Sequence, residues 1–159
     1  MLKKVVIGND HAAVDMKFKI KEYVESLGYE VINVGIDEER HSDYPDYAYK
    51  ACKKITNGEA SLGILICGTG IGMSIVANKI KGIRAVACSE TFSARMGREH
   101  NDANVLCFGQ RVIGIETAKE LVKAFLSGEF MGTHHKERIR KISDIENGTY
   151  KEWNMIIKF

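Results

Sequence analysis

The chain has 159 residues, 45% of them hydrophobic and 28% charged, which is enough for one domain with a sizeable core. Lysine plus arginine outnumber aspartate plus glutamate by only 23 to 21, and the two signs are interspersed, so neither nucleic acid nor a membrane surface is indicated as a partner. No apolar run approaches the ~20 residues of a membrane span. The first apolar run, in "KKVVIG", is too short for the core of a signal peptide.

Short strand-like runs alternate with helix-like segments along the chain. Strands are predicted at 3–8, 29–35, 62–67, 83–88 and 104–109, and helices at 14–27, 45–56, 73–81, 90–99, 115–127 and 134–146. Most strand-like runs are continuously apolar, which is typical of parallel strands covered on both faces. The alternation predicts a doubly wound α/β sheet in a single domain, 1–146.

Residues 147–159 are interpreted as a tail after this domain. Its apolar side chains suggest docking on its own or a neighbouring subunit: Trp153, Ile156, Ile157 and Phe159.

The most informative segment is "CGTGIG", residues 67–72, at the end of the third predicted strand. Glycines at 68, 70 and 72 let backbone N–H groups converge on an anion at the start of a helix. A nucleotide phosphate loop would need glycine-lysine followed by serine or threonine, and a dinucleotide fingerprint would need glycine where Met73 stands. A cysteine phosphatase would need an arginine in the loop, and 68–78 contain none.

Cys67 stands where this strand meets the loop, and two interpretations stay open. A thiol at a helix amino terminus is favoured as thiolate and could act as base or nucleophile. Alternatively, Cys67 packs like alanine, as we assume for Cys52, Cys88 and Cys107. The four cysteines have no paired spacing, which indicates free thiols in a reducing cytoplasm rather than zinc or disulfide sites.

Histidines flank other strand ends. Asp10 and His11 follow the first strand, and His100 and Asn101 precede the fifth, so all four are expected at the same sheet edge. We expect no metal site, because the five histidines lack metal-ligand spacing and the adjacent His134 and His135 should point to different sides of a helix. Arg138 and Arg140 are a solvated face unless a phosphate binds there.

Six segments taken together resemble the type B ribose-5-phosphate isomerases, whose relatives include galactose-6-phosphate isomerase subunits. They are "GNDHA", "SDYPDYA", "ILICGTGIGMSIVANK", "GIRAV", "EHNDANVLCFGQR" and "HHKERIRKI", in order from about residue 2 to 146. The resemblance implies a Rossmann-like three-layer sandwich with a five-stranded parallel sheet and helices on both faces. It also implies aldose–ketose isomerisation without metal or cofactor. The family forms homodimers, often dimers of dimers, whose active sites mix residues from two chains.

The resemblance also assigns roles to residues. Cys67 matches the base that moves a proton between carbons 1 and 2; other members carry glutamate at the position of Met73 instead. His100 matches the ring-opening residue, assisted by Asp10. The remaining positions match an anion hole (Gly68, Thr69, Gly70, Ile71, Gly72), sugar contacts (Asn101, Arg111) and the phosphate side (His11, His134, Arg138).

One departure concerns the phosphate side. Members commonly show "GGRH" where this chain reads "GTHH", so His134 replaces an arginine. We expect a cytoplasmic ribose 5-phosphate/ribulose 5-phosphate isomerase. Allose 6-phosphate and galactose 6-phosphate are alternative substrates. A non-catalytic sugar-phosphate sensor and, more remotely, a thiol-dependent phosphatase are alternatives from other classes.

Overall fold

The structure is a computed structural model that describes residues 3–152; the apolar tail residues from Trp153 onward lie outside this range. Five parallel strands form one sheet in the order β2-β1-β3-β5-β4. The strands are β1 (Lys4–Asn9), β2 (Glu30–Asn33), β3 (Leu62–Cys67), β4 (Ala85–Ala87) and β5 (Val105–Gly109). The predicted number and parallel direction of the strands are therefore confirmed.

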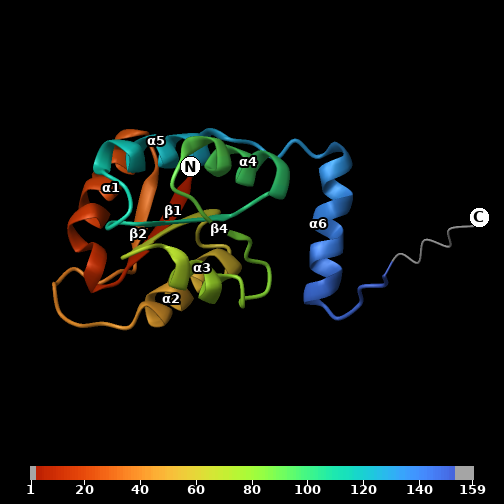
Figure 1. Cartoon of the computed structure of the whole chain (residues 1–159), viewed down its shortest axis with the longest axis horizontal. Helices are drawn as coiled ribbons and strands as arrows, with labels where there is room; N and C mark the ends of the chain where they lie inside the picture. Colours follow the sequence, from red (N-terminus) through yellow and green to blue (C-terminus); the bar gives the residue numbers. More distant parts are fainter. Residues whose placement is uncertain (1–2, 153–159) are drawn as a thin grey trace, which may run out of the picture.

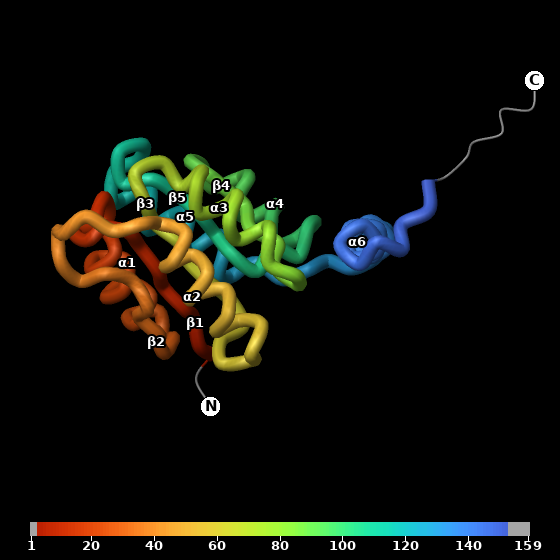
Figure 2. The backbone as a smooth tube through the Cα atoms, turned by 90° about the horizontal axis from the view of Figure 1, so that it is seen from below, coloured from red at the N-terminus to blue at the C-terminus, as the bar shows by residue number. Residues whose placement is uncertain are grey.

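Helices cover both faces of this sheet (Figure 1). Helices α2 (Tyr44–Thr56) and α3 (Ile71–Ala77) pack on one face. On the other face lie α1 (Val14–Ser26), α4 (Thr91–Asn101) and α5 (Ile115–Ser127), with a short 3-10 helix, η1 (His11–Ala13), leading into α1. The views in Figures 1 and 2 agree on this three-layer sandwich, as predicted.

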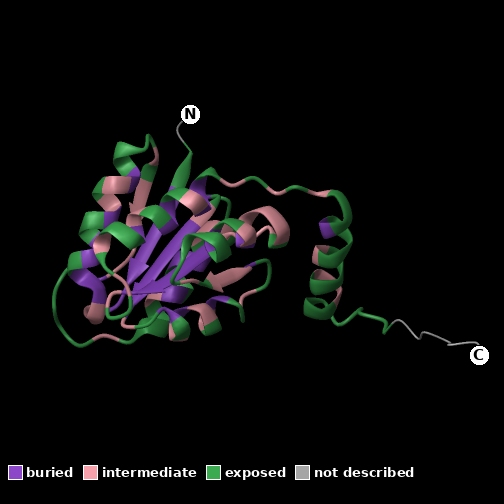
Figure 3. Ribbon diagram, turned by 45° about the horizontal axis from the view of Figure 1, so that its top comes forward, coloured by how far each residue is buried: buried purple, intermediate pink, exposed green. Residues whose placement is uncertain are grey.

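The core consists of two apolar layers, one on each side of the sheet. Alternate residues of a strand point to opposite faces, so Ile7 joins the layer under α1, α4 and α5, while Val6 joins the layer under α2 and α3. The central strands β1, β3 and β5 are almost wholly buried, as Figure 3 shows. Full burial of each such aliphatic side chain contributes ~1.5–3 kcal/mol, which explains why these runs are continuously apolar.

The boundaries of some elements differ from prediction, most clearly at α3, which was expected at 73–81. The helix begins earlier because Gly70, with φ of 80°, turns the chain directly into it. It ends at Ala77 because the Asn78 side chain bonds the backbone of Ala85 through both its oxygen (2.8 Å) and its nitrogen (2.9 Å), tying the chain to β4. The strands β2 and β4 are also shorter than the apolar runs that predicted them.

Helix α6 (Thr133–Glu146) stands apart from the sandwich in both backbone views (Figures 1 and 2). It follows α5 through the segment 128–132 and contacts α4. His135 is its buried residue, whereas Ile142 and Ile145 remain 45% and 61% exposed. Within residues 3–152, no helix is long and apolar enough to cross a bilayer.

Candidate active site

The order of the strands changes direction between β1 and β3, since β2 lies on one side of β1 and β3 on the other. Loops that leave neighbouring strands in opposite directions open a crevice at the carboxyl ends of the strands. The register places Asn9 beside Ile66, and Cys67 beside Gly109. The segments that follow β1, β3 and β5 therefore meet at one point.

A cavity of about 240 Å³ lies at this point. Its lining contains many of the residues predicted from the sequence, and we call five of them the carboxyl-edge cluster: Asp10, His11, Cys67, Thr69 and Arg111. Gly68 and Gly72 also line it. The main chain of Arg111 donates to the Gly68 carbonyl over 3.1 Å, which joins the β5 loop to the glycine loop.

Cys67 is only 5% exposed, but its sulfur is not isolated among aliphatic groups. The backbone N–H of Gly70 donates to Sγ over 3.1 Å, and the residue borders the cavity. The sulfur therefore lies in the wall of the cavity with a backbone amide held against it, where it can face a ligand.

The other three cysteines are in different surroundings. Burial raises the pKa of the Cys52 thiol to about 12 and that of Cys88 to about 11, the latter with help from the nearby Glu90 carboxylate. Burial also holds the pKa of Cys107 well above its usual value. These thiols remain protonated at neutral pH and pack as small apolar side chains, as predicted.

The glycine loop is shaped by close contact with β5. A side chain at Gly70 would place its Cβ 2.7 Å from the Cα of Phe108, and one at Gly109 would lie 2.4 Å from the Cα of Thr69. Gly70 also has a positive φ, which disfavours any other residue. Inside the loop, the Thr69 hydroxyl accepts from the N–H of Ile71 over 3.4 Å. The main chain of the loop therefore lies directly against the main chain of β5, with no room for a side chain between them.

Asp10 and His11 are oriented by local contacts. The Asp10 carboxylate caps η1 by accepting from the N–H of Ala12 over 3.0 Å. The N–H of His11 donates to the Ser42 hydroxyl over 3.0 Å, and His11 Nδ1 lies 3.1 Å from the Ser42 carbonyl. The His11 ring also stacks on His41, with centroids 5.1 Å apart. Because Ser42 engages Nδ1, Nε2 is the ring nitrogen left for a ligand.

Tyr44 is a lining residue that the sequence interpretation missed as a site residue. It begins α2, and its ring packs so closely on Gly72 that a Cβ there would be 2.8 Å from the ring. The signal was available, because "SDYPDYA" is one of the segments that carry the resemblance. Tyr44 thus adds a phenol, which can donate a hydrogen bond, to the residues that line the cavity.

Four more of the predicted residues, together with His135, form a second group, which we call the α4–α6 cluster: His100, Asn101, His134, His135 and Arg138. The His100 and His135 rings stack with centroids 4.2 Å apart, and the His134 and His135 rings lie 4.0 Å apart. The expectation that His134 and His135 point to different sides is therefore wrong. Burial lowers the pKa of His135, and the nearby His134, His100 and Arg138 lower it further, so its ring is held neutral.

The expectation that His100 and Asn101 share the edge of Asp10 is also wrong. Helix α4 starts beyond the carboxyl end of β4 and ends near the amino end of β5. It must cross the sheet in this direction because β4 and β5 are parallel, so both begin at the same edge. The Asn101 carbonyl accepts from the side chain of Arg84, which immediately precedes β4. Within this chain, none of the α4–α6 cluster lines the cavity beside Cys67.

These observations define a class: a doubly wound α/β protein in which a thiol that accepts a backbone hydrogen bond, a carboxylate, a histidine and an arginine surround a small crevice at the switch point of the sheet. A sequence model of the Ribose/Galactose Isomerase family matches residues 5–142. The chain belongs to this family.

Individual relatives cover nearly the whole chain. It is 46% identical to the ribose-5-phosphate isomerase B of Escherichia coli over 91% of this chain and 97% of that protein. It is 44% identical to the D-erythrulose-4-phosphate isomerase of Pectobacterium atrosepticum over 90% and 95%. The solved structure of Clostridium thermocellum ribose-5-phosphate isomerase B superimposes with a TM-score of 0.90 at 45% identity, over 91% of this chain and 98% of that one.

Proposed function

We propose that the protein is a cytoplasmic ribose 5-phosphate/ribulose 5-phosphate isomerase that needs no metal or cofactor. The observation that carries this proposal is the Cys67 sulfur, which accepts an N–H at 3.1 Å beside a carboxylate, a histidine and an arginine in one crevice. Family membership supports the same chemistry.

In the proposed reaction, His100 donates a proton to the ring oxygen of the sugar and Asp10 assists in opening the ring. The Cys67 thiolate then removes the proton from carbon 2, which leaves negative charge on oxygen 1 of an enediolate. A proton then moves from oxygen 2 to oxygen 1 of the enediolate, and return of the abstracted proton from Cys67 to carbon 1 gives the ketose. Amide groups of the loop 68–72 stabilise the developing charge, and the loss of one such donor typically costs ~3 kcal/mol of transition-state stabilisation.

The remaining predicted residues hold the substrate in this proposal. Asn101 and Arg111 contact the sugar hydroxyls, and the phosphate lies beside His11, His134 and Arg138. A firm hold on the remote phosphate keeps carbon 2 against the sulfur, which converts binding energy into rate.

We also propose that the active form is a homodimer, or a tetramer built from such dimers, in which a second chain completes each site. The carboxyl-edge cluster and the α4–α6 cluster lie at opposite ends of the strands within one chain. Helix α6 extends away from the sandwich with Ile142 and Ile145 exposed, and α3 exposes Ile71 and Ile75 by 57% and 56%. Exposed aliphatic side chains on an outlying helix are typical of a subunit interface.

An assay of the purified protein against a panel of aldose phosphates, without added metal, tests the function. We expect conversion of ribose 5-phosphate to exceed that of four-carbon and six-carbon aldose phosphates. A preference for allose 6-phosphate or galactose 6-phosphate would mean that the substrate is a six-carbon sugar phosphate and that the isomerisation reaction is the same. Binding of sugar phosphates without any turnover would indicate a non-catalytic sensor, and release of inorganic phosphate would indicate a phosphatase.

A His134→Arg variant is expected to bind ribose 5-phosphate more tightly than the wild type. Arginine offers a phosphate a planar fork of donors and a permanent charge, whereas histidine offers a single ring nitrogen. The Michaelis constant for ribose 5-phosphate should therefore fall several-fold in the variant. An unchanged Michaelis constant would contradict a phosphate contact at His134.

A further inference from the structure

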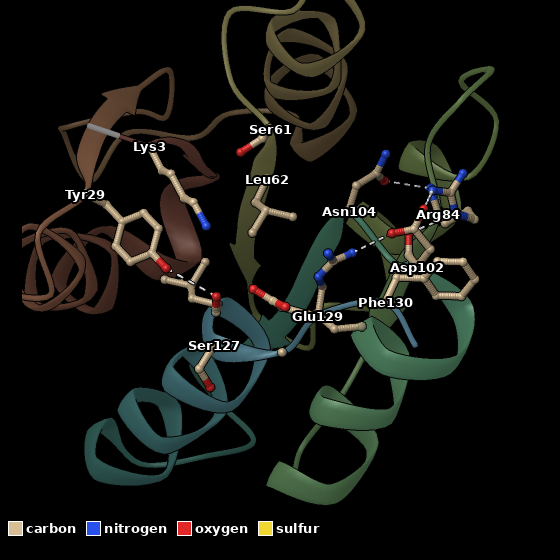
Figure 4. Close-up of a pocket in the computed structure, with 13 residues that line it drawn as sticks. Lys3, Tyr29, Ser61, Leu62, Arg84, Asp102, Asn104, Ser127, Glu129 and Phe130 are labelled. Carbon is tan, nitrogen blue, oxygen red and sulfur yellow. Dashed lines mark hydrogen bonds and ion pairs between the residues drawn. The ribbon is translucent and has the colours of Figure 1, made fainter. Parts of the chain in front are cut away.

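We propose that three residues outside the predicted site, Arg84, Arg98 and Asp102, form a clamp that positions His100 and Asn101. Their functional importance rests on the proposed function, in which His100 opens the sugar ring and Asn101 contacts the sugar. The clamp lies at the amino ends of the strands, in the wall of a cavity of about 760 Å³ (Figure 4). All three residues would act through the backbone of their neighbours and not by touching substrate.

The chain turns sharply just after His100. Helix α4 ends at Asn101, and Asp102 adopts a left-handed conformation with φ of 47° and ψ of 40°. The N–H of Ala103 then closes the turn by donating to the Gly97 carbonyl over 2.9 Å. This conformation costs free energy in any residue other than glycine, although aspartate tolerates it better than most. The direction of the last helical turn, which carries His100, is therefore set immediately beside Asp102.

The Asp102 carboxylate joins both arginines. Its Oδ2 lies 2.7 Å from Nη2 of Arg84, and its Oδ1 lies 2.9 Å from Nη1 of Arg98. The labelled side chains of Arg84 and Asp102 point toward one another in Figure 4. The side chains of Arg98 and Arg84 are 14% and 23% exposed and that of Asp102 is 33% exposed, so these charge-assisted bonds are partly shielded from water and stronger than fully exposed pairs.

Both arginines also donate hydrogen bonds to the main chain around the turn. Nε of Arg84 donates to the carbonyl of Asn101 over 3.2 Å and to that of Asp102 over 2.9 Å. Nη1 of Arg98 donates to the carbonyl of Ala103 over 2.7 Å. The last carbonyls of a helix have no partner inside it, and cationic groups there also complement the helix dipole. The clamp thus fixes the peptide groups on either side of the turn.

The clamp is in turn attached to the sheet. The N–H of Arg84 donates to Oδ1 of Asn104 over 2.8 Å, and the N–H of Asn104 donates to the Arg84 carbonyl over 3.0 Å. The Asn104 side chain also donates to the carbonyl of Gly82 over 2.8 Å. These bonds join the chain ahead of β4 to the chain ahead of β5, so His100 is oriented with respect to a rigid part of the molecule.

An Asp102→Gly variant tests the clamp. Glycine accepts a positive φ without strain, so the variant removes the carboxylate and keeps the turn. The imidazole NMR signals of the five histidines and the kcat for ribose 5-phosphate are measured. We expect the signals of His100 and His135 to shift, those of His11 and His41 to stay, and kcat to fall roughly 10- to 100-fold, as a small misplacement of a reacting group can cause.

Two further variants sharpen the comparison. Arg84→Lys keeps the positive charge but has a single nitrogen in place of the planar guanidinium. It therefore cannot hold the carboxylate and the two carbonyls in the same geometry, and it should change the same signals. Glu59→Gln is the matched control, because it removes a 2.7 Å ion pair with Lys54 on α2, outside both clusters. It should leave the histidine signals and kcat at their wild-type values.

Unchanged His100 signals and unchanged kcat in folded Asp102→Gly would overturn the clamp. A wild type that does not isomerise ribose 5-phosphate would overturn the proposed function instead, while the His100 signals would still decide whether the clamp exists. If Asp102→Gly does not fold, Asp102→Asn takes its place, because asparagine also tolerates the left-handed turn but lacks the charge. The same signals are then compared.

Discussion

Replacing Cys67 with alanine is expected to lower the kcat for ribose 5-phosphate by roughly 10²- to 10⁴-fold, the usual contribution of a general base. The variant keeps the glycine loop, because Gly70 and Gly109 still hold it against β5. It loses only the sulfur that the Gly70 N–H contacts at 3.1 Å. Binding of ribose 5-phosphate, measured by calorimetry, should therefore persist while turnover is lost.

Cys52→Ala is the matched control for this experiment. Cys52 is also buried, and its burial raises the pKa to about 12, so it cannot serve as a base at neutral pH. The control should lose some stability through the small space it leaves in the core, but its kcat should stay close to wild type. Near-normal turnover by Cys67→Ala would remove the thiol from the mechanism and leave the base to be found elsewhere in the crevice.

Two inactive variants are expected to restore activity when they share a dimer. Cys67→Ala and His100→Gln chains, carrying different affinity tags, are co-expressed and purified through both tags so that every dimer is mixed. If each site combines the carboxyl-edge cluster of one chain with the α4–α6 cluster of the other, one site of every mixed dimer is intact. The mixed sample should then show about half of the wild-type kcat per dimer, because a dimer has two such sites.

Each parent variant, purified through its single tag, serves as the control and should remain inactive. A mixed sample as inactive as its parents would mean that Cys67 and His100 act within one chain. An active His100→Gln parent would instead mean that His100 plays no part in turnover. Gel filtration of the same samples shows whether a dimer forms at all. A monomer in solution would contradict the shared site directly.

Much of the fold could be predicted because its signals are local. Continuous apolar runs such as the one ending at Cys67 are needed wherever a strand is covered on both faces, so β1, β3 and β5 were predicted nearly to the residue. The end of α3 could not be predicted in the same way. It depends on the Asn78 side chain bonding Ala85, a contact between segments that periodicity does not connect.

The candidate site divides along the same line. Asp10, His11 and Cys67 follow strands that are neighbours in the sheet, so the rule for strand ends brought them together correctly. His100 was misplaced because it precedes a strand, and the start and end of a parallel strand lie at opposite edges. Tyr44 was missed because its contact with Gly72 arises from the packing of α2 on α3.

The amino-acid sequence by itself determined the layers, the strand count and the chemical identity of the candidate site residues, since these follow from hydrophobic patterning and from side-chain chemistry. Only the tertiary structure decided which groups meet: a sulfur bonded by an amide at 3.1 Å, and a set of histidines held on α4 and α6 away from it. The reason is physical. Strand order and the direction of each crossover decide which distant segments come close together. Neither can be inferred from the spacing of residues along the chain.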